Sequence, residues 1–334
     1  MPAVWAGVAL PSDLGEPAGV SCPSTAHCVV VSNAPVSGGT APLVVAISAA
    51  APSWTAGALP GGLANLYGVS CPSDRTCMAV GGSGGTDGIG AAAIAVTGDG
   101  GLTWSSAAIP ASNSDLQGIS CPSTTRCVAV GDGNDGSPGS VLTTSDGGAS
   151  WSTGRIPNGV TGDYSRVACP STTTCVAVGA GAIYSSNGGR TWSSGKLPNG
   201  ASDLQSVACR STRYCVAVGS GQASPWGGPG TGSAVYTTDG GRTWSVGRVP
   251  RHLFGLYASA CPSTRRCVAL GVGAAVVTST GGVTWTKGSL ARPSAVLSDV
   301  SCPTSAACVA VGALGAGQGD PVALSSSDGG RSWR

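Results

Sequence analysis

The sequence predicts an all-β fold, a β-propeller of seven four-stranded antiparallel blades, and three observations carry that prediction. A phrase such as GISCPSTTRCVAVG occurs seven times, each time with two cysteines in C-x5-C spacing. A second phrase such as TSDGGASW follows every cysteine pair, and the period of 40 to 52 residues is typical of stacked or circular repeats. A composition with 55 Gly, 5 % aromatic and 10 % charged residues does not suit a helical bundle.

Each repeat contains the signals for four short strands. In the third repeat, the phrase LQGIS at 116–120 predicts the first strand and CVAVG at 127–131 the second, with a five-residue hairpin loop between the two cysteines. A Gly-rich stretch leads to a third strand around 140–145, and a DGG turn leads to a fourth around 151–157. Radial repetition of such blades leaves few exposed sheet edges, so residues 1–334 are expected to form a single propeller domain.

The two ends of the chain indicate how the ring closes. Residues Trp5 to Leu10 look like the last strand of a repeat, and the C-terminal repeat stops at Arg334, directly after its second phrase. We therefore expect the N-terminal strand to complete the seventh blade. The alternative is that both ends are cuts in a longer array of repeats.

The cysteine pairs are expected to form one hairpin disulfide per blade, each worth roughly 2 kcal/mol. The spacing differs from the C-x-x-C of redox motifs, and 2 His offer few zinc ligands. The expected pairs are Cys22 with Cys28, Cys71 with Cys77, Cys121 with Cys127, Cys169 with Cys175, Cys209 with Cys215, Cys261 with Cys267 and Cys302 with Cys308.

So many disulfides predict an oxidising compartment, and hence an extracellular, cell-surface or periplasmic location. The chain begins MPAVWAGVALP, which has no signal-peptide pattern, so the export signal is expected to have been removed or to lie in a longer gene product. The longest apolar run, at 41–52, is too short for a membrane span.

The second phrase resembles the Asp box, S/T-x-D-x-G-x-T/S-W, of the bacterial neuraminidase repeat. The copies that end at Trp104, Trp151, Trp192, Trp244 and Trp333 carry Asp99, Asp146, Asn187, Asp239 and Asp328 at the acidic position. The resemblance implies a propeller like those of sialidases, sortilin-type ectodomains, xyloglucan-degrading hydrolases and photosystem II assembly factors. It also implies that the acid caps a turn and that any active or binding site lies on the face opposite the boxes.

Enzymatic function is constrained by the scarcity of carboxylates. Sialidase chemistry, as the resemblance implies it, needs an arginine triad, a Tyr nucleophile with a Glu partner and an Asp acid, yet the one Glu, Glu16, occupies a repeated turn position. An Asp-dependent glycoside hydrolase remains open, because two suitably spaced Asp suffice. Its candidate acids lie in the variable loops and are Asp87, Asp132, Asp135 and Asp320.

No cofactor is expected. The loop that contains Asp132, Asn134 and Asp135 carries oxygen ligands that suit Ca²⁺, but it lacks the full spacing of a known calcium loop. Metal binding is therefore only a minor alternative here.

Residues that depart from the repeat are the candidates for ligand binding. Tyr67 and Tyr257 lie four residues before a first cysteine, where they either ring the channel mouth or pack between blades. The binding candidates are Trp226, Arg251, His252, Phe254, Tyr67 and Tyr257.

Charge is distributed unevenly although the net charge is only +2. Residues 1–167 contain 4 basic and 10 acidic side chains, whereas residues 168–334 contain 13 and 5. This asymmetry suits a polyanion such as an acidic glycan near the arginines of the second half, or reflects drift in composition with solvated arginines. Nucleic acid is not expected for a disulfide-rich chain with so little net charge.

Two functions follow as hypotheses. The first is a secreted, non-catalytic propeller that binds an extracellular glycan or protein through its variable loops. The second is an Asp-dependent glycoside hydrolase of the same architecture. Neither the ligand nor the oligomeric state follows from the sequence.

Overall fold

The computed structural model describes residues 9–36, 39–48, 51–83, 91–110, 114–133, 139–158, 160, 162–220, 232–315 and 319–334. A 3-10 turn at Ser12–Leu14 precedes the first strand, and the rest of the regular structure in these ranges is β-strand. No helix of the described chain is long and apolar enough to cross a membrane.

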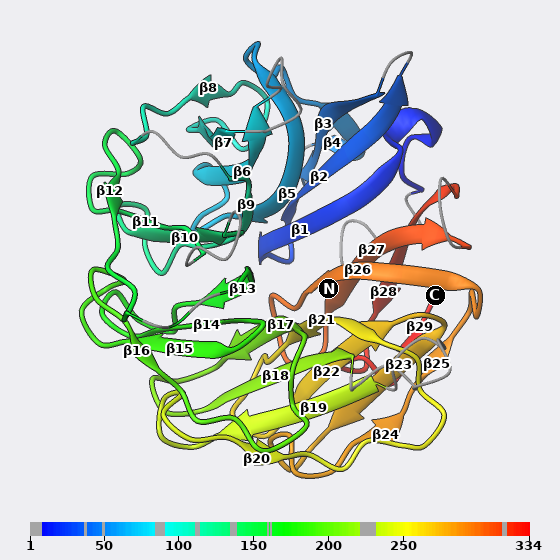
Figure 1. The fold of residues 1–334 in the computed structure, drawn as a ribbon. Coiled ribbons are helices and arrows are strands. Elements are labelled where there is room, and N and C mark those ends of the chain that lie inside the picture. Colours follow the sequence, from blue (N-terminus) through cyan, green and yellow to red (C-terminus); the bar gives the residue numbers. More distant parts are fainter. Residues whose placement is uncertain are drawn as a thin grey trace.

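Seven antiparallel sheets are arranged around a central axis, as the sequence predicts (Figure 1). The first three blades are β1 (Glu16–Ser24), β2 (His27–Val36), β3 (Gly39–Ser48) and β4 (Ala51–Ala56); β5 (Leu63–Ser70), β6 (Cys77–Ser83), β7 (Ala91–Thr97) and β8 (Ser105–Ser106); and β9 (Leu116–Ser120), β10 (Cys127–Gly131), β11 (Val141–Thr144) and β12 (Ser152–Thr153).

The next three blades are β13 (Tyr164–Ala168), β14 (Cys175–Gly179), β15 (Ala182–Ser185) and β16 (Ser193–Ser194); β17 (Leu204–Cys209), β18 (Cys215–Ser220), β19 (Gly232–Thr237) and β20 (Ser245–Val246); and β21 (Leu256–Ala260), β22 (Cys267–Gly271), β23 (Ala274–Thr278) and β24 (Thr286–Lys287). The seventh blade contains β26 (Ala295–Ser301), β27 (Cys308–Leu314) and β28 (Pro321–Ser326), while β25 (Ser289–Leu290) pairs in parallel with β29 (Ser332–Trp333).

The second strand of each blade supplies most of the core. The CVAVG segment of β10 is buried at every position because its small and β-branched side chains pack against the neighbouring blades. Gly131 ends this segment, and a Cβ there would lie 2.0 Å from the carbonyl oxygen of Asp115 on the inner strand. The glycine is required because β9 shifts register at this point and brings its backbone close.

All fourteen cysteines form the expected disulfides, one in each blade, and each bond closes the hairpin between the first and second strands. The Cα–Cα distance in the third blade is 4.1 Å. The seven bonds join Cys22 to Cys28, Cys71 to Cys77, Cys121 to Cys127, Cys169 to Cys175, Cys209 to Cys215, Cys261 to Cys267 and Cys302 to Cys308.

The hairpin of blade 1 differs from the expected five-residue loop between the cysteines. Strand β1 continues to Ser24 and β2 begins at His27, and these two residues pair across a two-residue turn. Cys28 is therefore the second residue of β2, whereas the second cysteine of every other blade is the first residue of its strand. The loop prediction is wrong around Cys28, because β1 shifts register between Ser21 and Ser24 and so continues past its own cysteine.

The Asp boxes and the cysteine hairpins lie on one face of the ring, here called the hairpin face. In the third blade, the amide of Gly147 in the box donates to the carbonyl oxygen of Thr125 in the hairpin at 2.9 Å. The boxes of blades 2 and 4 to 7 repeat this contact through Gly100, Gly188, Gly240, Gly281 and Gly329. The loops between second and third strands therefore emerge on the opposite face, here called the variable-loop face.

Where the box carries an acid, the acid holds a turn, as expected. Asp99 accepts hydrogen bonds from the Leu102 and Thr103 amides at 3.0 Å and from the Thr103 hydroxyl at 2.6 Å. The bonds from Thr103 hold the pKa of the Asp99 carboxyl down at about 2. Asn187 fills the same place in blade 4, where its amide donates to the Thr191 hydroxyl at 2.7 Å.

The first and seventh blades meet through the same contact as other neighbouring blades. The amide of Cys22 donates to the Ser301 hydroxyl at 3.0 Å, just as that of Cys71 donates to Ser21 at 2.9 Å. Cys28 and Leu10 join the core cluster between these two blades. Trp5, at the start of the strand expected to complete the seventh blade, lies outside the described residues.

Candidate functional site

A cavity of about 630 Å³ opens on the variable-loop face at the central end of the inner strands. Side chains from five blades line it, so it lies where the blades converge. We call it the mouth cavity. Its lining includes Ser12, Asp13, Glu16, Ala18, Asn33, Pro35, Tyr67, Gln117, Arg166, Ser298, Asp320 and Pro321.

The repeat itself places these side chains at the mouth. Ala18, Tyr67, Gln117 and Ser298 all lie four residues before the first cysteine of their blade. Because the same inner-strand position recurs in each blade, it delivers a different side chain from each direction to one central space. Of the blades with Tyr or Gln at this position, those of Tyr67 and Gln117 present it to the cavity, whereas Gln205 and Tyr257 do not line it.

The carboxylates of Asp115, Asp132 and Asp163 lie near one another beside the cavity, and we call them the acidic group. The Tyr67 hydroxyl donates to Asp115 at 3.5 Å, and the Gln117 amide donates to Asp132 at 2.7 Å. Burial raises the pKa of the Asp132 carboxyl, and the nearby Asp163 and Asp115 carboxylates raise it further. The group therefore gathers negative charge at the edge of the cavity.

Asp115 has one carboxylate oxygen in contact with Tyr67 and one that is buried. The buried Oδ1 has no hydrogen-bond partner among the described residues and lies against Gly82, where a Cβ would be 2.2 Å away. Burial raises the pKa of the Asp115 carboxyl, while the bond from Tyr67 opposes that rise.

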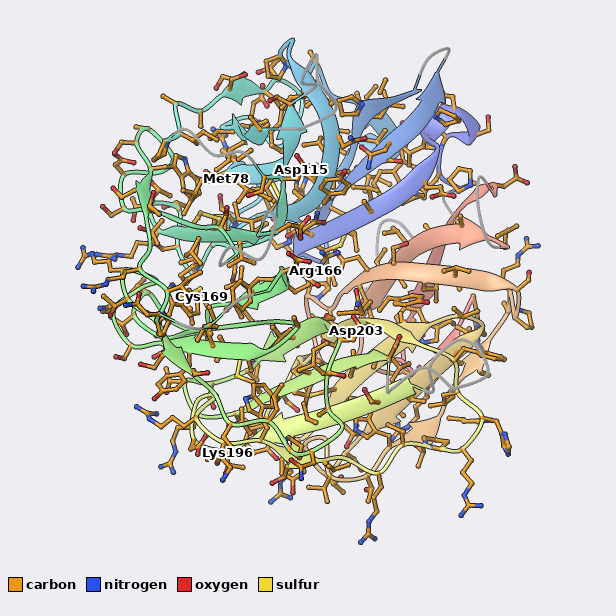
Figure 2. The ribbon with its side chains drawn as sticks, in the orientation of Figure 1. Met78, Asp115, Arg166, Cys169, Lys196 and Asp203 are labelled. Carbon is orange, nitrogen blue, oxygen red and sulfur yellow. A yellow bond between two sulfur atoms is a disulfide. The ribbon has the colours of Figure 1, made fainter. Side chains whose placement is uncertain are left out.

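Arg166 is the one basic side chain that lines the cavity among the described residues. Its guanidinium donates to the carbonyl oxygens of Gln117 at 2.8 Å and Ser165 at 3.0 Å. The absence of a side chain on Gly118 leaves room for Arg166, whose Cα lies 3.0 Å from the place of a Cβ. Figure 2 shows Arg166 and Asp115 toward the centre of the ring and Lys196 at its outer edge.

Arg166 also acts on the half-buried Asp299 of β26. Asp299 accepts hydrogen bonds from the Val20 and Val300 amides at 2.8 and 2.9 Å. Burial raises the pKa of the Asp299 carboxyl, against the opposing effects of the Arg166 charge and of these two amides. Asp299 thus ties blade 7 to blade 1.

The structure brings some of the predicted site residues together and separates others. Tyr67 and Asp320 line the mouth cavity, and Asp132 is held beside it by Gln117. Tyr257 is half-buried on the inner strand β21 and does not line the cavity. Arg251, His252 and Phe254 lie in the connection between blades 5 and 6, exposed and away from the cavity lining.

Four further candidates lie outside the described residues, namely Asp87, Asn134, Asp135 and Trp226. The calcium hypothesis rested on two of these together with Asp132. No group of three or more His, Cys, Asp or Glu side chains that suits a metal is present in the described part of the chain.

Sequence reasoning missed Glu16 and Arg166 as cavity residues. Glu16 shares its repeat position with Asp115, and although the pattern there predicts a turn, the position also presents a side chain to the cavity. Arg166 lies three residues before Cys169, where the first three blades have glycine. The other blades have Gly, Ser, Ala or Asp at this position, so a long basic side chain there is the signal in the sequence for Arg166.

Solved structures with the same fold include binding proteins and enzymes. YCF48 bound to D1 peptide is 17 % identical with a TM-score of 0.58, over 82 % of this chain and 81 % of that chain. YCF48 from Cyanidioschyzon merolae is 16 % identical with a TM-score of 0.63, over 96 % and 97 %. An ancestral GH74 enzyme is 14 % identical with a TM-score of 0.62, over 97 % of this chain and 45 % of that chain.

The expected resemblance is confirmed at the level of the fold. Identities this low carry no function across, because one fold hosts many unrelated functions. No protein-family model matches the chain, and no curated protein matches it in sequence.

Proposed function

We propose that this propeller is a non-catalytic binding protein that holds an extracellular peptide or glycan segment in the mouth cavity. The observation that carries the proposal is the cavity of about 630 Å³ itself, which is the size of a typical small-ligand or segment-binding site. Its walls combine apolar surface from Pro35 and Pro321 with polar groups from Asn33, Gln117 and Arg166.

The chemistry of the cavity favours binding over catalysis of the sialidase type. A tyrosine nucleophile needs a lowered pKa or a base that accepts its proton in the reaction. Burial and the neighbouring Asp115 carboxylate raise the pKa of the Tyr67 phenol, and Asp115, the base nearest its hydroxyl, is 3.5 Å away, a long contact for proton transfer. A single arginine on the described lining also falls short of the triad that a sialidase uses for its substrate.

The structural neighbours support both binding and hydrolysis as general possibilities. One of them is described as bound to a peptide, and another as a GH74 enzyme. The seven disulfides indicate a non-reducing environment, and we propose secretion or display at the cell surface on that basis.

The test is a screen of peptide and glycan arrays with the wild type and two cavity-filling variants, Ala18→Trp and Ser298→Trp. Both residues line the cavity, so an indole in either place should abolish the signal of a ligand that occupies it. Thr124→Trp is the matched control, because Thr124 is exposed on the hairpin face. The proposal is contradicted if every ligand of the wild type binds both cavity variants equally, or if no ligand binds at all.

A second candidate function is Asp-dependent glycoside hydrolysis. The observation that favours it is that Asp132 lies near Asp115 and that burial and this second carboxylate raise the pKa of Asp132, the direction of shift that a general acid requires. Release of reducing sugar from xyloglucan or another glycan by the wild type, and its loss in Asp132→Asn, would establish this alternative in place of the binding role.

A further inference from the structure

The hairpin face carries a concentration of arginines over blades 5 to 7. Arg210 and Arg213 lie in the hairpin of blade 5, and Arg265 and Arg266 in that of blade 6. Arg242 and Arg331 lie in the boxes of blades 5 and 7. All are exposed except Arg266, which is half-buried. We call these six residues the arginine arc.

Contacts between blades make the arc continuous. The guanidinium of Arg210 donates to the carbonyl oxygen of Pro262 in the next hairpin at 3.0 Å. That of Arg266 donates to the carbonyl oxygen of Ser305 in the hairpin of blade 7 at 3.3 Å. The arginines of one blade therefore reach the loop of the next.

Backbone carbonyl oxygens of the box also hold the arginines of blade 5. Arg213 donates to the carbonyl oxygen of Thr238 at 3.3 Å, and Arg242 donates to that of Asp239 at 2.7 Å. Arg242 also lies over the Tyr184 ring, 5.0 Å from its centroid, which steadies the side chain.

The partners of these four guanidinium groups are backbone carbonyl oxygens, which orient the groups without neutralising them. Each guanidinium has five N–H donors, so most remain available for an anion. The carboxylates of the neighbouring boxes, Asp239 and Asp328, accept from Thr243 and Ser332 within their own turns. The arc has six cationic side chains, and the two carboxylates near it are already hydrogen-bonded within their own turns. The arc is therefore strongly positive.

We propose that the arginine arc binds a linear polyanion, specifically an acidic polysaccharide. Arginine matches sulfate and carboxylate groups with two parallel hydrogen bonds. A row of such groups spread over three neighbouring blades suits a ligand with anionic groups repeated along a chain. The non-reducing environment of a disulfide-rich protein favours a polysaccharide over a nucleic acid as that chain.

This site is separate from the mouth cavity, because hairpins and variable loops lie on opposite faces. The arc is independent of the ligand proposed for the cavity. The protein would then hold an anionic matrix with one face and present the mouth cavity on the other.

The experiment measures binding of the intact oxidised chain to heparin, used as a sulfated polysaccharide probe, by biolayer interferometry over a salt series. The arc variant is Arg213→Ala/Arg265→Ala, in which both side chains are exposed. The matched control is Lys287→Ala/Arg292→Ala, which removes the same charge from exposed positions outside the hairpins and boxes. Arg213→Lys/Arg265→Lys keeps the charge but not the paired donors.

We expect the arc variant to weaken heparin binding at least about tenfold and the control less than about twofold, with the Lys variant between them. Wild-type affinity should fall steeply from about 50 to about 200 mM salt, because exposed charges are screened. Ala18→Trp should leave heparin binding unchanged. Melting curves of all variants establish that the fold is intact.

Three results would overturn the proposal. The first is no heparin binding by the wild type at about 150 mM salt, where screening is already physiological, and the second is equal weakening by the arc and control variants. The third is tighter binding of double-stranded DNA than of heparin, which would replace the polysaccharide with a nucleic acid. None of these results bears on the cavity, which the array screen tests.

Discussion

Removing one hairpin disulfide should cost the protein about 3 kcal/mol of unfolding free energy. Cys121→Ala/Cys127→Ala opens a loop closed over a sequence separation of 6. In the chain-entropy model a loop of this size contributes about 2 kcal/mol, because the bond restricts the unfolded chain. Cys127 is only 1 % exposed and packs in the core between blades 2 and 3, so the lost sulfur adds about 1 kcal/mol.

The seven bonds should give nearly the same result. All have a sequence separation of 6 and Cα–Cα distances of 4.0 to 4.1 Å. The second cysteine of every pair, Cys28 of the divergent first hairpin included, is also almost fully buried, at 0 or 1 % exposure. The seven double-alanine variants should therefore differ from one another by less than about 1 kcal/mol.

The assay is equilibrium urea unfolding followed by tryptophan fluorescence. Ser123→Ala is a control in the same hairpin, because it keeps the disulfide and removes the bond from the Arg126 amide to the Ser123 hydroxyl at 3.1 Å and the bond between the Ser123 and Thr125 hydroxyls at 3.3 Å. That control should cost about 1 kcal/mol or less. A disulfide variant within about 0.5 kcal/mol of wild type, or a spread above about 3 kcal/mol among the seven, would refute the reasoning.

Two further predictions concern the Asp box and the strand glycine. The folded-state pKa of Asp99 is about 2 against an ordinary 3.8, so its carboxylate stabilises the fold above about pH 4 and this stabilisation is lost as the pH falls toward 2. Between about pH 2 and 4, the urea midpoint of Asp99→Asn should therefore change less with pH than that of the wild type. Parallel curves of midpoint against pH would contradict the assignment. Gly131→Ala places a Cβ 2.0 Å from the Asp115 carbonyl oxygen and should cost more than about 3 kcal/mol, whereas Gly98→Ala meets nothing within 4 Å and should cost less than about 1 kcal/mol. Equal melting temperatures of the two alanine variants would show that the close approach is not what requires the glycine.

The fold was predictable because its determinants are local and repeated. Cys121 and Cys127 predict a hairpin through their spacing, and Asp146 predicts a turn through its box. Each local pattern alone is a weak predictor of structure, but its seven copies together predict one repeated blade. The role of Gly131 and the tight turn before Cys28 were less evident, because each depends on a register shift between neighbouring strands.

The mouth cavity was only partly predictable, since it is formed by residues far apart in sequence. Tyr67 and Gln117 could be placed by their common repeat position, and both line the cavity. Asp13, Glu16 and Asp320 converge on it only because the ring brings blades 1 and 7 side by side. The repeat pattern at the two ends predicts ring closure, but no local pattern predicts that these three side chains face one cavity.

The charge asymmetry of the sequence acquires a clearer form in three dimensions. The excess of basic residues after position 167 is concentrated partly on one face of blades 5 to 7. The acidic excess of the first half places Asp115 and Asp132 beside the mouth cavity on the other face. The sequence predicts a difference in charge between the two halves of the chain. In the structure, part of that difference lies between the two faces of the ring, because the arginines of the second half lie in hairpins and boxes.

The most direct test of the binding role is hydrogen exchange of the intact protein with and without the strongest array ligand whose binding Ala18→Trp and Ser298→Trp abolish. The account predicts protection at the cavity-lining ends of β1, β5 and β9, around Glu16, Tyr67 and Gln117, with the cysteine hairpins unchanged. Protection confined to the hairpins and boxes, with the cavity lining unaffected, would contradict it.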